Sequence, residues 1–226
     1  MNIVLKSLFL LTALLSVGCA SVQKPIAVED GLYTKANKVV VVMEPIPDPT
    51  THFPGADCLL CMATAEGLHM TLGDHAETLD GAEFKLSKSE LAGHLKEKGV
   101  DAIVLDDPLV VKDLPKIKAE GENAVPRDFS EVASPHDGTH VLVISVSRIG
   151  ISRAFASYVP TEDPVAIVEG IGYLIDVRDN TYDWYQPFKV VKGVEGEWDQ
   201  PPDFPKLTNA FYQVLAEARD EILGNF

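Results

Sequence analysis

The sequence predicts an α/β domain in which a mixed sheet ends in an antiparallel hairpin and helices pack on the sheet. Three observations support this fold class. A β-branched run at 38–45 precedes two helical patterns and a further apolar run, which is the order of an α/β unit. Two long strand-like segments flank the turn sequence RDNT at 178–181. The last segment carries an apolar stripe at helical spacing.

The first half of the domain begins with KVVVVMEP at 38–45, a continuous apolar run typical of a strand buried on both faces. Four prolines between 45 and 54 exclude a helix there. We expect a helix from Asp57, as N-cap, to about Leu72, ending at Gly73.

A second helix is expected to open with the capping box SKSE at 87–90 and to close at Gly99. The next strand is DAIVLDD at 101–107. Residues 106–138 are rich in Lys, Asp, Glu and Pro, so we expect an irregular excursion with a weak helical stretch near 129–133.

The second half is predicted to hold a strand at 140–152 and a hairpin of 166–177 with 182–191. A proline-containing loop follows at 193–205. The final helix should bury one face, formed by Leu207, Phe211, Val214, Leu215, Ala218 and Ile222.

The first eighteen residues have the pattern of a secretory signal. Lys6 precedes an apolar run that is too short to span a membrane as a helix, and Gly18 and Cys19 follow it. We therefore expect a signal peptide at 1–18, a lipidated N-terminus and tether at 19–37, and one α/β domain at 38–226. Leu14–Cys19 resembles the lipobox of bacterial lipoproteins, which implies lipid on Cys19, and Ala20 implies sorting to the outer membrane, on its periplasmic face.

The mature chain is strongly acidic. Its charge changes from -15 to -16 when Lys6, the only charged residue of 1–18, is removed. Such a surface repels nucleic acid and predicts no nucleic-acid partner.

Cys58 and Cys61 form a C-x2-C pair in PGADCLLCMATAEGLH, and the periplasm would permit a disulfide between them. One zinc ion cannot also reach His69, because eleven helical residues span about 16 Å. A redox pair at a helix N-terminus is a further reading, although both intervening residues are leucine and a proline-rich loop precedes the helix. On a helix the pair falls on the face with Ala65 and Leu72, so we expect a disulfide or buried thiols with a structural role.

Other chemistry-bearing residues form no recognised motif. The chain has no G-x-S-x-G elbow, phosphate-binding glycine loop or H-E-x-x-H pattern. Asp176, Asp179 and Asp183 are expected to be turn formers or solvated edge charges, and His136 and His140 to lie on the surface. The sequence therefore predicts no catalytic residue, no metal and no cofactor.

The order of elements resembles a group of envelope lipoproteins. The matching stretches are KVVVVMEP, SELAGHLKEKGVDAIV, and VLVISV leading to GIGYLIDVRDNTYDWYQ. The group includes the amino-terminal domain of TolB, the curli secretion lipoprotein CsgG and the Pel exopolysaccharide lipoprotein. The resemblance implies a non-enzymatic scaffold or accessory subunit in outer-membrane assembly, export or surface-structure biogenesis. The partners it implies are the membrane, other envelope proteins and further copies of the chain. A thiol-redox protein using Cys58 and Cys61, and a module that binds a small ligand or peptidoglycan, are the alternatives.

Overall fold

The computed structural model describes residues 23–33 and 37–226, and the signal and Cys19 predictions fall outside these ranges. In the described part of the chain the main sheet has six strands, in the order β3-β1-β4-β7-β8, with β2 paired to β4. Strand β1 (Lys38–Met43) runs parallel to β3 (Asp101–Val104) and β4 (His140–Ser152). Strands β7 (Val165–Asp176) and β8 (Thr181–Lys192) form the antiparallel hairpin. The predicted mixed α/β class is confirmed.

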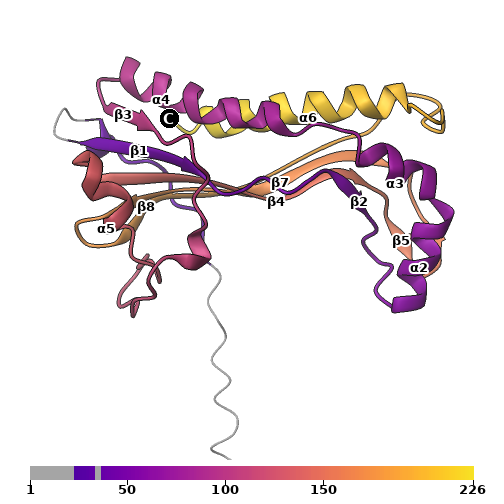
Figure 1. Cartoon of the computed structure of the whole chain (residues 1–226), viewed down its shortest axis with the longest axis horizontal. Helices are drawn as coiled ribbons and strands as arrows, with labels where there is room; N and C mark the ends of the chain where they lie inside the picture. The colour runs from indigo at the N-terminus through magenta and orange to yellow at the C-terminus, as the bar shows by residue number, and fades with distance from the viewer. Residues whose placement is uncertain (1–22, 34–36) are drawn as a thin grey trace, which may run out of the picture.

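One face of the sheet is covered by α4 (Leu86–Glu97) and α6 (Pro205–Leu223), which lie above the strands in Figure 1. All six residues of the predicted α6 stripe are buried, and they pack in the larger of the sheet's two hydrophobic clusters. The expectation that this helix covers the core is therefore confirmed.

Strand β1 is buried on both faces, as its four consecutive valines predict. Val39 and Val41 face the cluster under α4 and α6, whereas Val40 and Val42 face a second cluster on the opposite side. The second cluster includes Phe129 and Ala133 from segment 106–138. That segment holds only η3 (Val111–Asp113), α5 (Ser130–Ala133) and η4 (Ser134–His136), and it forms the lower left part of the molecule in Figure 1.

The helix expected over 57–72 is instead two helices, α2 (Leu59–Leu68) and α3 (Met70–Ala76). The break falls at His69, whose backbone leaves the helical region, and Gly73 lies inside α3. The N-cap is Cys58, not Asp57, because its Sγ accepts the N–H of Cys61 at 2.9 Å. The break places the His69 ring in a buried aromatic contact that helical periodicity does not reveal.

Three further local features differ from the sequence expectations. Helix α4 begins at Leu86 after η2 (Ala82–Lys85), and the hydroxyl of Ser87 donates to the carbonyl of Phe84, so the capping box does not form. Strand β2 (Thr50–His52) and the small hairpin of β5 (Phe155–Ala156) and β6 (Val159–Pro160) were not anticipated. All three strands are very short, which leaves little periodicity to detect.

Residues 23–33 lie against the domain, so the tether expected over 19–37 does not extend through them. Ile26 forms a β-bridge with Tyr185 of β8, and η1 (Asp30–Leu32) buries Leu32 in the core. The apolar side chains of this stretch supply the burial that holds it on the sheet. No helix among the described residues is long and apolar enough to cross a membrane.

Candidate functional site

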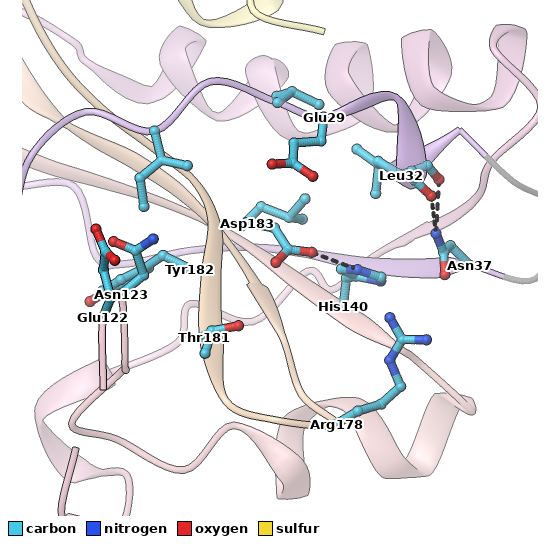
Figure 2. A pocket seen from close by; sticks show the side chains of 14 residues that line it. Glu29, Leu32, Asn37, Glu122, Asn123, His140, Arg178, Thr181, Tyr182 and Asp183 are labelled. Carbon is cyan, nitrogen blue, oxygen red and sulfur yellow. Dashed lines mark hydrogen bonds and ion pairs between the residues drawn. The ribbon is translucent and has the colours of Figure 1, made fainter. Parts of the chain in front are cut away.

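A polar pocket of about 400 Å³ lies where the segment 26–32 passes over the start of β4 and the turn of the β7–β8 hairpin (Figure 2). Glu29 and Asn37 come from the chain before β1, and Glu122 and Asn123 come from the excursion at 106–138. Carboxylates outnumber the cationic side chains in this lining. The pocket therefore suits a small polar ligand with neutral or cationic groups.

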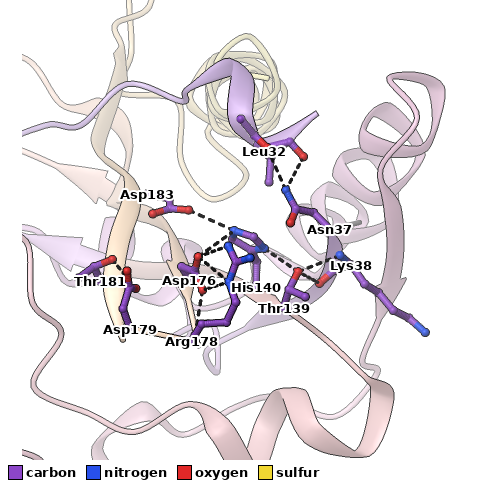
Figure 3. A network of polar contacts seen from close by, with 11 residues as sticks. Leu32, Asn37, Lys38, Thr139, His140, Asp176, Arg178, Asp179, Thr181 and Asp183 are labelled. Atoms are coloured by element: carbon purple, nitrogen blue, oxygen red, sulfur yellow. Dashed lines mark hydrogen bonds and ion pairs between the residues drawn. The ribbon is translucent and has the colours of Figure 1, made fainter. Parts of the chain in front are cut away.

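His140 lies at the base of this pocket and is only 1% exposed. Its Nε2 lies 3.1 Å from Oδ2 of Asp183 and 3.8 Å from Oδ2 of Asp176, and its Nδ1 lies 2.8 Å from the hydroxyl of Thr139 (Figure 3). The antiparallel register places His140 directly opposite Asp176. The ring thus links the first residue of β4 to both strands of the hairpin.

Asp176 is buried and carries its own cation. The Arg178 guanidinium donates to both of its carboxylate oxygens, and the Arg178 backbone N–H donates to Oδ1 at 2.9 Å. Burial alone would raise the pKa of Asp176. The hydrogen bonds from Arg178, together with the nearby His140, outweigh that effect and hold the pKa below its usual value.

His140, Asp176 and Asp183 together offer three ligand atoms within 4.8 Å of one another. A divalent cation placed there would lie beside the guanidinium of Arg178, which already occupies both oxygens of Asp176. Like-charge repulsion opposes that arrangement. The cluster therefore fits an ion-pair network that secures the hairpin turn better than a metal centre.

These residues correct two sequence expectations. His140 is buried, not a surface residue, and Asp176 is a buried partner instead of a solvated edge charge. Asp179 does act in the turn, where its carboxylate accepts the Thr181 hydroxyl. The signal that was missed lies in strand register, because residues 36 apart in the chain become neighbours only when β4 pairs with β7.

The cysteine pair lies at the start of α2, and Figure 1 shows α2 at the end of the sheet where β2 pairs with the last residues of β4. The pocket is at the opposite end of β4, beside its first residue, His140. Cys58 and Cys61 form a disulfide. Cys61 is buried against Phe53, Ala65 and Phe155, but Cys58 is exposed, so the expectation that both cysteines face the core is wrong for Cys58. Cys58 precedes the first helical turn, where its Sγ caps the helix and bonds to Cys61.

The outer surface of α2 is apolar. Leu59 is 90% exposed and Leu60 is 66% exposed, Met62 and Leu68 are exposed as well, and Met70 at the start of α3 is also exposed. Glu66 is the only charged residue of α2. Solvated helix faces are usually polar or charged, so this surface indicates a contact with another molecule.

Comparisons with solved structures give matches of low identity and low TM-score. No family model and no curated protein matches the chain. The PelC dodecamer structure from Paraburkholderia phytofirmans is 14% identical, with 91% of this chain and 93% of that chain covered and a TM-score of 0.38. Protein XCC0632 from Xanthomonas campestris is 12% identical, with 90% of each chain covered and a TM-score of 0.41.

Lipoprotein GNA1162 from Neisseria meningitidis is 16% identical, with 80% of this chain and 99% of that chain covered and a TM-score of 0.31. The resemblance of the chain to TolB and CsgG stays a prediction.

Proposed function

We propose that this chain is a lipid-anchored, non-enzymatic protein of the bacterial cell envelope. In this proposal it acts as a scaffold or accessory subunit in outer-membrane assembly, export or surface-structure biogenesis. The observation that carries the proposal is the lipobox-like sequence ending at Cys19, behind a basic start and a short apolar run. Three acyl chains on that cysteine would hold the protein at the membrane far more firmly than one.

Two features of the domain support this proposal. The Cys58–Cys61 disulfide is suited to an oxidising compartment, which an exported protein would reach. The exposed apolar face of α2 is suited to binding, and its leucines supply no group for acid–base or nucleophilic chemistry. The proposed partners are envelope proteins, including further copies of this chain.

The anchor is tested with a Cys19→Ser variant. We expect the unaltered protein to incorporate labelled palmitate and to sediment with outer membranes, and the variant to lose both properties because its hydroxyl cannot replace the lipidated thiol. Ser16→Leu, which brings the lipobox closer to the common pattern, is the matched control and should retain both. A Cys19→Ser protein that stays membrane-bound as before would overturn the anchor.

A second candidate function is thiol–disulfide exchange at Cys58, and the exposure of this residue favours it. A client thiolate would attack Sγ of Cys58, and Sγ of Cys61 would leave as a thiolate. A second client thiol would then release Cys58, so that the client is oxidised and the pair takes up two electrons. The helix N-terminus would stabilise the Cys58 thiolate that is released.

Variants at the two cysteines separate the candidates. Exchange also runs in reverse, so it predicts that the Cys58 thiolate of Cys61→Ser attacks client disulfides and keeps the client as a mixed disulfide, whereas the control Cys58→Ser traps none. A structural bond predicts no adducts with either variant. It also predicts that Cys58→Ala/Cys61→Ala loses about 2 kcal/mol of unfolding free energy, the loop-closure value for so short a loop. Urea denaturation measures that loss.

A further inference from the structure

Helix α2 lies largely on the side of the sheet that faces away from α4 and α6. In Figure 1, α2 and β5 extend below the sheet at one end, and segment 106–138 extends below it at the other. Strand β4 connects the two ends, because it starts beside segment 106–138 and its last residues pair with β2. Its thirteen residues span about 43 Å at ~3.3 Å per residue.

The proposed anchor reaches the protein on this same side. Gln23 is the first described residue, and its side-chain amide donates to Oδ1 of Asn123, in segment 106–138, at 3.1 Å. Cys19 lies only four residues earlier, and four residues reach at most about 14 Å. A lipid on Cys19 therefore holds this side of the sheet close to the membrane surface.

Segment 106–138 is less acidic near its middle than at its ends. It contains four basic side chains (Lys112, Lys116, Lys118 and Arg127) and eight acidic ones (Asp106, Asp107, Asp113, Glu120, Glu122, Asp128, Glu131 and Asp137), so its net charge is -4. All four basic residues lie within 110–129, where four acidic residues balance them. Ile117 of this segment is also partly exposed.

We propose that the lipid bilayer covers the apolar face of α2, so that the domain is attached at two points about 40 Å apart along the sheet. This inference rests on the proposed lipid anchor at Cys19. Leu59 and Leu60, in the first turn of α2, enter the boundary between headgroups and acyl chains, whereas Glu66 lies about 10 Å further along the helix axis and stays in water. Insertion of the two leucines is favourable because it removes their exposed apolar surface from water. The second contact fixes the orientation of the domain, with α4 and α6 directed away from the membrane.

The test uses full-length lipidated protein in vesicles of phosphatidylethanolamine and phosphatidylglycerol, with and without bromine on the acyl chains. Leu60→Trp reports the α2 face, and Leu86→Trp, at a position 52% exposed at the start of α4, is the matched control. We expect brominated lipid to reduce the added fluorescence at position 60 roughly twofold, because interfacial helices lie about 5–10 Å deep. At position 86 we expect no reduction.

Each outcome of the quenching experiment either supports or contradicts the contact between α2 and the bilayer. Equal quenching at positions 60 and 86 overturns the α2 contact. Emission at position 60 that shifts to the blue without quenching also overturns it, because the tryptophan would then be buried against another copy of the protein and not in lipid. Palmitate incorporation, measured on the same preparation, tests the anchor separately. Palmitate incorporation without quenching at position 60 contradicts the α2 contact but not the anchor. Quenching in a Cys19→Ser protein supports the α2 contact even if the anchor prediction fails.

Discussion

His69 joins three parts of the chain through one imidazole ring. Its Nδ1 donates to the carbonyl of Ala65 at 3.0 Å, and the guanidinium of Arg153 donates to its Nε2. The ring packs against Phe53 and Phe155, with centroids 5.5 and 5.6 Å away. These contacts require the neutral imidazole, because a proton on Nε2 would point at the positive charge of Arg153.

We expect acid to destabilise the protein through His69. Burial lowers its pKa, the hydrogen bond to Ala65 partly offsets this, and the charge of Arg153 lowers the pKa further. As the pH falls below about 6.5, the unfolded chain therefore takes up this proton before the folded one. The stability is fully present above that pH and is lost as the pH falls toward the lower pKa of the folded state.

Melting temperatures at pH 7.5 and pH 5.5 measure this effect. His69→Gln should flatten the dependence only in part, because burial also lowers the pKa values of His52 and His75. His94→Gln, on α4, is the control. If the melting temperature at pH 5.5 is not lower than at pH 7.5, the role assigned to His69 is wrong.

At the scale of elements, the β7–β8 hairpin depends on the absence of side chains at two positions of β7. A Cβ on Gly172 would lie 2.3 Å from the Trp184 ring, and a Cβ on Gly170 would lie 2.2 Å from the Ser145 carbonyl oxygen. Trp184 is fully buried and packs edge-on against Phe226, with centroids 4.8 Å apart. Gly172 thus provides the space in which the indole covers the strand.

Gly172→Ala should lower the free energy of unfolding by roughly 1–3 kcal/mol, because the core is overpacked. In a protein that already carries Trp184→Leu, Gly172→Ala should cost less unfolding free energy than it does in the parent protein, because the smaller leucine leaves room for the added methyl group. The two changes are then non-additive. Gly93→Ala in α4 meets nothing within 4 Å and should stabilise by roughly 0.5–1 kcal/mol. Urea unfolding of Gly172→Ala, Trp184→Leu, the double variant and Gly93→Ala tests this, and strict additivity of the two single changes would count against the packing explanation.

Periodicity predicted the elements whose own side chains determine burial, such as β1, β4 and α6. It failed where distant residues decide the local structure. The break at His69 depends on Arg153 and Phe155, which lie more than eighty residues later in the chain. The His140 cluster depends on the pairing of β4 with β7, and the exposure of Cys58 depends on where α2 begins. Of the candidate site, the sequence identified the cysteine pair but not the pocket.

At the scale of the whole molecule, the sheet edges differ in how open they are to pairing. The outer edge of β8 is partly occupied by the bridge from Ile26, and it also carries Pro187 and Lys189. Proline and lysine on an edge discourage pairing with another chain. Strand β3 at the opposite edge has only four residues and lacks both residue types.

We expect the Cys19→Ser protein to self-associate, with β3 as the edge available to a second copy. Light scattering measures the mass at a protein concentration of about 100 µM, which is on the order of the dissociation constant of a weak contact. Ile103→Lys on β3 should lower that mass, whereas Val191→Lys on β8 should leave it unchanged. A strictly monomeric mass for the parent protein would rule out assembly without the anchor.

The two-faced burial of β1 also has a consequence for folding kinetics. Its neighbour β4 follows about one hundred residues later, since Val39 pairs with His140. At a synthesis rate of about 5–20 residues per second, Val39–Met43 emerges roughly 5–20 s before its central partner exists. A continuous β-branched run without charge is prone to aggregate in that interval. Lys38 and Glu44 flank the run and act as charged gatekeepers, so neutralising both should lower the yield of folded protein more than its equilibrium stability.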